Sequence, residues 1–310
     1  MDHVRAADVP ALVEEYTRSL QGKGAATVDV YQRILRQITG WIAERPGNAG
    51  TFQAEQLTQT ALATYLAQLE ADGYSISHRA RVKAVVSGFA RWLIEEQGTL
   101  RRNPARGIAV PPQPLLAPRE LHPNQRFVLR QLVERDGTPR SAALFALGYW
   151  AGCRVSDVAW LQLAHTHVGL RVGWLHVGYK GGKARDIDLH NEARRPLYHY
   201  LQHGGRDPES PYVFTSQRNA RLSEAGIHHW FRALKARATK DEWEYIHDVT
   251  FHDLRHDFAH RARTAGWSLE EVAYYLGHIT KKGTPAIQTT VRYTQVGRAH
   301  LKEQLKHLKG

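Results

Sequence analysis

The chain has 310 residues, a formal net charge of +12 and a single cysteine, Cys153. One cysteine excludes an intramolecular disulfide, and the sequence shows neither the apolar region of a signal peptide nor the ~20 apolar residues of a membrane-spanning helix. These features favour a cytoplasmic globular protein. The first 110 residues carry 13 Lys and Arg against 11 Asp and Glu, so most of the positive surplus lies in the C-terminal two thirds. Such a surplus favours a polyanionic partner, and a merely solubilising surface is the alternative.

Residues 1–112 show the apolar periodicity of helices in four stretches. These stretches are 8–20, 26–43, 56–70 and 77–96. Four cations lie mostly off the apolar stripe of the last stretch: Arg79, Arg81, Lys83 and Arg91. The segment 103–118 holds five prolines, which fix φ and remove amide donors, so we expect an extended linker there. The sequence therefore predicts a helical domain over 1–112 and a second domain over 113–310.

The second domain shows mostly helical patterns. Helices are expected at about 122–135 and 139–151, from Glu192, from Ser223 to about 238, over 251–260, and from Ser268 to Gly277. A Ser/Thr-x-x-Asp/Glu capping pattern begins the last two of these helices. The stretches RVGWLHVG (171–178) and ARDIDL (184–189) flank a glycine turn and predict a β-hairpin. The predicted fold class is mainly α with a small antiparallel sheet: a helical N-terminal domain and a mixed α/β C-terminal domain.

The segment FHDLRHDFAH places His252, His256 and His260 at every fourth position, a spacing that can mark a metal-binding helix. Asp253 stands where the H-E-x-x-H zinc pattern has glutamate. Arg255 projects within about 60° of His252, where its charge would oppose a bound dication. The sequence also contains no Cys-x-x-Cys pattern. We therefore expect no metal site.

The apolar face of the same segment, through Leu254, is expected to pack on the core and to leave His252 and Arg255 on its rim. An arginine and a histidine in that position suit an anion, because a guanidinium presents a fork of donors that matches phosphate oxygens. A second candidate is Arg154, in AGCRVSDVAWL. For Arg154 two interpretations stay open, a phosphate contact and a structural pair with Asp157.

Six residues in order resemble the tyrosine recombinase (phage integrase) family. That family has an arginine box, a lysine on a β-hairpin, H-x-x-R, L-G-H and a tyrosine. The matching stretches here are WAGCRVSD, GYKGGK, FHDLRH, LGH and TTVRYTQV, and they contain Arg154, Lys180, His252, Arg255, His278 and Tyr293. The N-terminal half, through SHRARVKAVVSGFARWL and RRNPA, is similar to the family's helical DNA-gripping (core-binding) domain. The chain departs from the family in Asp157, where glutamate is commoner, and in a longer insert, 279–288, before the tyrosine.

The resemblance implies phosphoryl transfer on DNA without a metal, a cofactor or ATP. The two arginines would clamp the non-bridging phosphate oxygens, and His278 would add a hydrogen bond. His252 would accept the proton of the attacking Tyr293, and Lys180 would protonate the leaving 5′-oxygen. The product would be a 3′-phosphotyrosine link, which conserves the phosphodiester energy. Lys183, in the same turn, is the rival for the role of Lys180 and is otherwise expected to contact DNA.

The same resemblance implies a double-stranded recombination site as the partner, bound by a homotetramer with one dimer on each site. The four cations of the 77–96 helix, together with Lys183, are the expected DNA contacts. The amphipathic tail 294–310 would dock on a neighbouring protomer. Two alternatives stay open: a type IB topoisomerase, in which lysine tends to replace His252, and a catalytically silent DNA-binding relative. The expected location is the cytoplasm, in association with the nucleoid.

Overall fold

The computed structural model describes residues 11–112, 119–178, 184–216, 221–280, 284–286 and 290. The chain divides into two compact units, Met1–Pro114 and Leu115–Gly310, and the division falls inside the proline-rich segment. Each unit has its own hydrophobic core. None of the helices in the described part of the chain combines the length and the apolar character of a membrane span.

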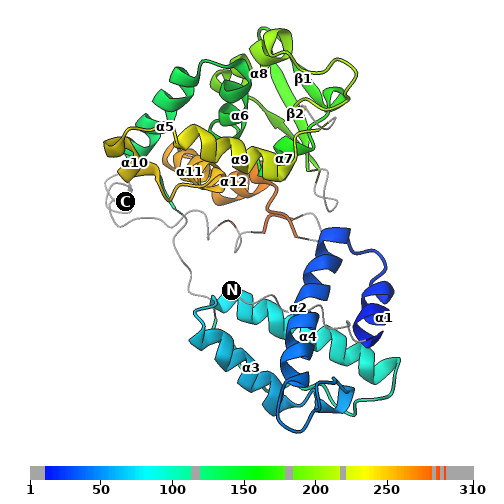
Figure 1. Ribbon diagram of the computed structural model, residues 1–310. Coiled ribbons are helices and arrows are strands. Elements are labelled where there is room, and N and C mark those ends of the chain that lie inside the picture. Colours follow the sequence, from blue (N-terminus) through cyan, green and yellow to red (C-terminus); the bar gives the residue numbers. More distant parts are fainter. Residues whose placement is uncertain are drawn as a thin grey trace, which may run out of the picture. The chain divides into compact units, whose positions relative to one another are not determined.

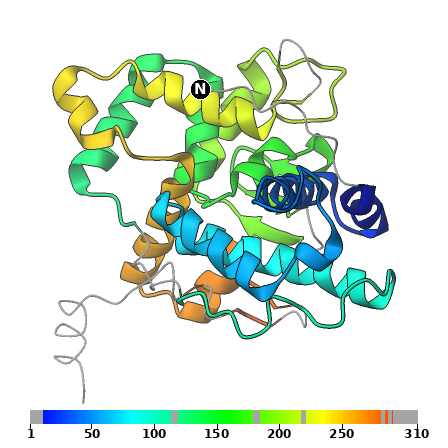
Figure 2. The same cartoon turned by 60° about the horizontal axis from the view of Figure 1, so that its bottom comes forward.

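The first unit is built from helices (Figure 1). They are α1 (Ala11–Ser19), α2 (Ala25–Ala43), α3 (Gln59–Ala71) and α4 (Ile76–Glu95), with a 3-10 turn, η1, at Ala54–Gln56. All four predicted helices are confirmed. Hydroxyl caps begin two of them: Thr58 Oγ1 accepts from the Ala61 N–H at 3.1 Å, and Ser75 Oγ accepts from the His78 N–H at 3.2 Å. Figure 2 looks almost along α1 and α2, which pack side by side.

The second unit combines helices with one small sheet (Figure 1). Its described helices are α5 (Pro123–Asp136), α6 (Pro139–Tyr149), α7 (Val155–Ala159), α8 (Asn191–His203), α9 (Glu224–Lys235), α10 (Lys240–Ile246), α11 (Phe251–Thr264) and α12 (Leu269–Leu276), with a 3-10 turn, η2, at Leu163–His165. Its described strands are β1 (Thr166–Val168), β2 (Gly173–Val177) and β3 (Arg185–Asp188). The predicted fold class is confirmed.

The sheet is antiparallel with the order β1-β2-β3, and the predicted hairpin is the pair β2–β3. Leu175 lies opposite Ile187, and both are buried on the core face. The sequence did not predict β1, because three residues are too few to display a period of two. It also missed α10, although TKDE carried a signal: Thr239 and Glu242 form the capping box that begins this helix.

The central helix of the second unit is α6, which is buried over most of its length and packs on α8 and α11. The contact with α11 requires glycine at position 148, because a Cβ there would lie 2.9 Å from the Phe251 ring. Gly152 has a φ of 59°, and a Cβ there would lie 2.7 Å from the Phe258 ring. These close approaches bring the stretch after α6, with the first candidate arginine, against α11, with the second.

Candidate active site

Four of the six candidate catalytic residues lie in the described part of the second unit: Arg154, His252, Arg255 and His278. The first directly precedes α7, the next two lie at the start of α11, and the last follows α12 after one glycine. Three further candidates lie outside the described residues: Lys180, Lys183 and Tyr293. The tail 294–310 also lies outside them, so the roles of these residues stay predictions.

Arg255 is fully buried, with 0% of its surface exposed. Its guanidinium donates from Nη1 to the Gly152 carbonyl at 2.7 Å and from Nη2 to the Leu276 carbonyl at 2.6 Å. It therefore joins the stretch before α7 to the end of α12, and the carbonyls offset part of the cost of burying its charge. The predicted position of Arg255 on the rim of the core is wrong, because these two neighbouring segments close over its guanidinium.

His278 is 4% exposed and lies between two polar partners. Arg255 Nη2 is 3.1 Å from its Nε2, and Thr290 Oγ1 is 3.2 Å from its Nδ1. Burial, and then the charges of Arg255 and Arg154, lower the pKa of His278 to about 2, so the ring is neutral near pH 7. Because a guanidinium can only donate, Nε2 accepts, and Nδ1 carries the proton that it donates to Thr290. Thr290 Oγ1 in turn donates to the Ala286 carbonyl at 3.4 Å.

Arg154 has a side chain that is 28% exposed at the start of α7. Its backbone N–H donates to Asp157 Oδ2 at 3.0 Å, and its Nη2 donates to the Gly277 carbonyl at 3.0 Å. Arg154 Nη1 lies 3.9 Å from the same Asp157 oxygen. The structure is compatible with both interpretations of this arginine: Asp157 holds the residue in place, and the guanidinium keeps an exposed edge that can meet an anion.

His252 lies at the surface of α11, with its ring edge-on to that of His256 and the centroids 4.5 Å apart. Desolvation by the surrounding protein, and then the charge of Arg255, lower the pKa of His252, so a neutral ring is available to accept a proton. Burial, and then His252, lower the pKa of His256 to about 4. His260 Nδ1 lies 4.0 Å from Glu120 Oε2. Among the described residues, no three His, Cys, Asp or Glu side chains are grouped so that they could hold a metal ion.

Sequence reasoning missed two residues of this site, Arg185 and Thr290, which are 8% and 0% exposed. Arg185 Nε donates to the Tyr275 carbonyl at 2.6 Å, and its Nη2 donates to Asp157 Oδ2 at 3.2 Å. A signal for Arg185 was present, since the period of two in a strand places it on the same face as the buried Ile187. The sequence contained no comparable indication for Thr290, which lies in a polar stretch before the candidate tyrosine and belongs to no recognisable pattern.

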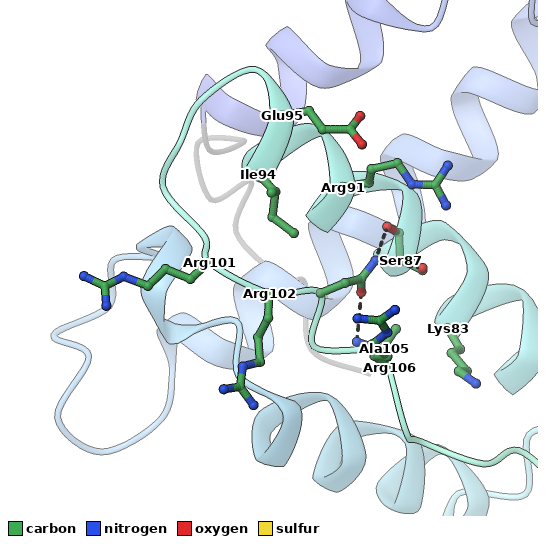
Figure 3. Close-up of a pocket in the computed structure, with 10 residues that line it drawn as sticks. Lys83, Ser87, Arg91, Ile94, Glu95, Arg101, Arg102, Ala105 and Arg106 are labelled. Atoms are coloured by element: carbon green, nitrogen blue, oxygen red, sulfur yellow. Dashed lines mark hydrogen bonds between the residues drawn. The ribbon is translucent and has the colours of Figure 1, made fainter.

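The cations of α4 lie in different surroundings. Arg79 is 7% exposed, and its Nη1 lies 2.7 Å from Glu70 Oε2. Its charge is therefore compensated within the first unit, and we expect it to stabilise that unit rather than to contact DNA. Arg81 and Arg91 are exposed, and Lys83 is half-buried. Lys83 and Arg91 line one pocket, which also contains other cations (Figure 3).

The helical fold and the two arginines that meet beside His278 define the class of protein. Residues 125–300, from α5 past all four described candidates, match the phage integrase family. The chain therefore belongs to this family, the tyrosine recombinases. It is 31% identical to the tyrosine recombinase XerC of Pseudomonas aeruginosa (strain LESB58), over 95% of this chain and 92% of that protein. It is also 31% identical to the tyrosine recombinase XerC of Pelobacter propionicus, over 89% of this chain and 87% of that protein.

Solved structures share the fold. The Tn1549 transposon integrase in complex with a circular intermediate DNA superposes with a TM-score of 0.74, over 96% of this chain and 98% of that one, at 15% identity. The XerH site-specific recombinase bound to palindromic difH substrate gives a TM-score of 0.67, over 95% and 83%, at 16% identity. A lambda integrase tetramer bound to a Holliday junction gives 0.65, over 90% and 76%, at 18% identity. At these identities the likeness establishes the fold alone.

Proposed function

We propose that the protein is a site-specific DNA recombinase that cuts and rejoins strands through a 3′-phosphotyrosine link at Tyr293. One observation carries this proposal. Arg255 and Arg154, from different elements, donate hydrogen bonds to the carbonyls of the two residues that precede His278. Two guanidinium groups and an imidazole brought together in this way suit a phosphodiester. The family and the names of its similar members support the same reaction.

The candidate residues can transfer the phosphoryl group from the DNA 5′-oxygen to Tyr293 with each bond and each proton accounted for. The exposed edge of Arg154 would bind one non-bridging phosphate oxygen, and Arg255 would stabilise the negative charge that develops in the transition state. The neutral His252 would accept the phenolic proton of Tyr293, whose oxygen then attacks phosphorus. The bond to the 5′-oxygen breaks as the bond to the tyrosine forms, and Lys180 would protonate the leaving oxygen. Since one phosphoester bond replaces another, rejoining requires no ATP.

The hydrogen bonds of His278 restrict when this residue can donate to a phosphate. In the present arrangement its Nε2 accepts from Arg255, so it cannot also donate to a phosphate oxygen. To donate, the ring has to take the other tautomer or gain a proton when DNA binds. The negative charge of a phosphate favours the protonated ring, so the substrate itself would promote this change.

Covalent capture tests the proposal. Purified protein is incubated in EDTA with fragmented genomic DNA of the source organism and then denatured, and the DNA that remains attached is sequenced. We expect one recurrent sequence, attached through its 3′-phosphate to the peptide that contains Tyr293. Attachment through a 5′ end, or a requirement for a divalent metal or ATP, would overturn the proposal.

Covalent capture together with a plasmid relaxation assay separates the alternatives. A type IB topoisomerase would relax supercoiled plasmids that lack the captured sequence, and a silent relative would bind DNA without forming an adduct. His252 favours the recombinase, because lysine tends to stand at this position in the topoisomerases that the family resembles.

We further propose that the protein acts as a homotetramer, with one dimer on each double-stranded site and the tail 294–310 docked on a neighbouring protomer. The tetramer of lambda integrase on a Holliday junction supports this assembly. We also propose a cytoplasmic location in association with the nucleoid, because the proposed substrate is double-stranded DNA. Lys183, Arg81, Lys83 and Arg91 are the proposed DNA contacts outside the reacting phosphate.

A further inference from the structure

Arg185 on β3 is a buried arginine to which the proposed reaction assigns no role. It is 8% exposed, and Asp157 in α7 is 6% exposed. The Arg185 guanidinium donates from Nη2 to Asp157 Oδ2 at 3.2 Å and from Nε to the Tyr275 carbonyl at 2.6 Å. It therefore connects three segments that are distant in the sequence: the small sheet, α7 and the end of α12.

The segments that Arg185 contacts are the ones that hold Arg154. The backbone N–H of Arg154 donates to Asp157 Oδ2 at 3.0 Å, and Arg154 Nη2 donates to the Gly277 carbonyl at 3.0 Å. Arg185 lies against Gly277 as well, because a Cβ at that glycine would lie only 2.9 Å from Arg185 Nη1. Gly277 also has a φ of 66°, which favours glycine. Both residues that accept these hydrogen bonds from Arg154 are therefore contacted by Arg185.

The carboxylate of Asp157 lies between two guanidinium groups, and its single charge can compensate one of them. Asp157 Oδ2 is 3.2 Å from Arg185 Nη2, within hydrogen-bond distance, and 3.9 Å from Arg154 Nη1, beyond that distance. The carboxylate is thus paired with Arg185. The side chain of Arg154, which is 28% exposed, keeps its charge for an anion. This geometry favours a phosphate contact over a structural pair with Asp157 as the role of Arg154.

The arrangement around Arg185 is a poor source of stability. Arg185 Nη1 has no hydrogen-bond partner within the described part of the chain. A buried ion pair with an unsatisfied donor contributes little net stability, because both charges have lost their contact with water. Arg185 also shares the buried face of β3 with Ile187, where an apolar side chain would be the simpler choice. Stability alone therefore does not explain an arginine at this position.

We propose that Arg185 is a positioning residue for Arg154 in the recombinase reaction. By pairing with Asp157 and packing against Gly277, it keeps the Arg154 guanidinium from closing on Asp157 and leaves it for the scissile phosphate. Within the described residues, Arg154 and Arg185 are the two salt-bridge partners of Asp157. Without Arg185, the buried carboxylate would therefore draw Arg154 into a salt bridge. The inference rests on the proposed function, and it gives Arg185 no contact with DNA.

The main experiment compares two substrates with the Arg185→Met variant of the full chain. The captured DNA carries either a normal scissile phosphate or a methylphosphonate, in which a methyl group replaces one non-bridging oxygen and the negative charge is lost. The lost charge reduces the need for an arginine clamp. Relative to the wild type, cleavage of normal DNA should fall by about 10²-fold, the scale of a misplaced reacting group. Cleavage of the methylphosphonate should fall at least about ten times less.

Arg194→Met is the matched control, because it removes another buried arginine of the same unit. Arg194 is 5% exposed and donates to the Gly169 and Leu170 carbonyls between β1 and β2. Its loss should lower the cleavage of both substrates by the same factor. An equal loss on both substrates in Arg185→Met would indicate a purely structural role and would overturn the inference. Unchanged cleavage of normal DNA by Arg185→Met would overturn it as well.

A double variant tests whether Arg185 acts through the charge of Asp157. Asp157→Asn keeps an oxygen that can accept the Arg154 N–H, but it lacks the charge that would capture the Arg154 guanidinium. Arg185→Met combined with Asp157→Asn should therefore cleave normal DNA at least about tenfold faster than Arg185→Met alone. A double variant that is no faster than Arg185→Met would contradict the proposed role of the pair.

A third substrate excludes a route through Lys180, which follows β2 in the sequence and is the proposed general acid. A 5′-phosphorothiolate link places sulfur at the leaving position, and a thiolate leaves without needing a proton. Arg185→Met should keep its full loss of about 10²-fold on this substrate. Recovery on the phosphorothiolate without recovery on the methylphosphonate would mean that Arg185 acts through Lys180, and the assignment to Arg154 would be wrong.

Thermal unfolding shows whether each variant is folded. If Arg185→Met does not fold, Arg185→Gln carries the same comparisons, because it also removes the charge and keeps a hydrogen-bond donor. If the wild type forms no adduct, the proposed function fails, and the role of Arg185 fails with it. If the wild type forms the adduct and Arg185→Met departs from these results, only the role of Arg185 fails.

Discussion

Replacing Tyr293 by phenylalanine should abolish the covalent protein–DNA adduct and leave DNA binding within about twofold. Phenylalanine has no oxygen to attack phosphorus, and losing a nucleophile lowers the rate of chemistry by at least about 10⁴-fold. The ring itself is kept, and phosphate contacts dominate affinity for DNA, so binding should persist. Denaturing gels of the captured DNA measure the adduct, and a mobility shift under native conditions measures binding.

Two other tyrosines provide the controls for that experiment. Tyr274 is 66% exposed on α12, and Tyr274→Phe should form the adduct at the wild-type rate. Tyr275 donates its hydroxyl to the Asp188 carbonyl at 3.0 Å, and burial raises its pKa, which makes it a poor nucleophile. An adduct that persists in Tyr293→Phe and disappears in Tyr275→Phe would contradict the assignment of the nucleophile.

Replacing Arg255 by lysine should lower the rate of cleavage by about 10²–10³-fold, the effect of losing one preorganised donor in an active site. The charge is conserved in this variant, but an ammonium cannot span the Gly152 and Leu276 carbonyls as the guanidinium does, so the buried positive charge is no longer held in the same place. Removing Arg255 also takes away the donor to His278 Nε2. Single-turnover cleavage with saturating protein separates this loss of chemistry from any change in binding.

Arg261→Lys is the matched control, since it makes the same change on the same helix. Arg261 lies six residues, nearly two helical turns, beyond Arg255 and its Nε donates to Asp257 Oδ2 at 2.9 Å, so its loss should change cleavage by no more than about threefold. Thermal unfolding of both variants shows whether the fold is intact. Wild-type cleavage by a folded Arg255→Lys would remove this arginine from the mechanism.

Helix positions followed closely from local patterns. The stretches with a 3.6-residue period became α1 to α4, and the hydroxyl caps at Thr58 and Ser75 lie where those helices begin. Such features depend on residues three or four apart, which the linear order displays directly. The three-residue strand β1 escaped prediction because its place is set by pairing with β2 rather than by its own pattern.

The candidate site was predicted only in part from the sequence. The sequence order alone identified four described residues, and the two arginines among them do approach His278. The burial of Arg255 was not predicted. Helix arithmetic placed Arg255 on a rim, and nothing in FHDLRHDFAH shows that carbonyls from α12 and from the stretch before α7 enclose it.

The sequence by itself determined the family, the helices and the order of the candidate residues, because each depends on residue types at short, countable spacings. Only the tertiary structure decided that Arg255 is buried, that Arg185 contacts Asp157 and Thr290 contacts the candidate residue His278, that Arg79 is compensated by Glu70, and that five cations line one pocket of a nearly neutral domain. The physical reason is the same in each case. Burial, hydrogen-bond partners and local charge depend on which distant segments of the chain pack together. A periodic pattern reports only residues that are close in the sequence, so it does not contain this information.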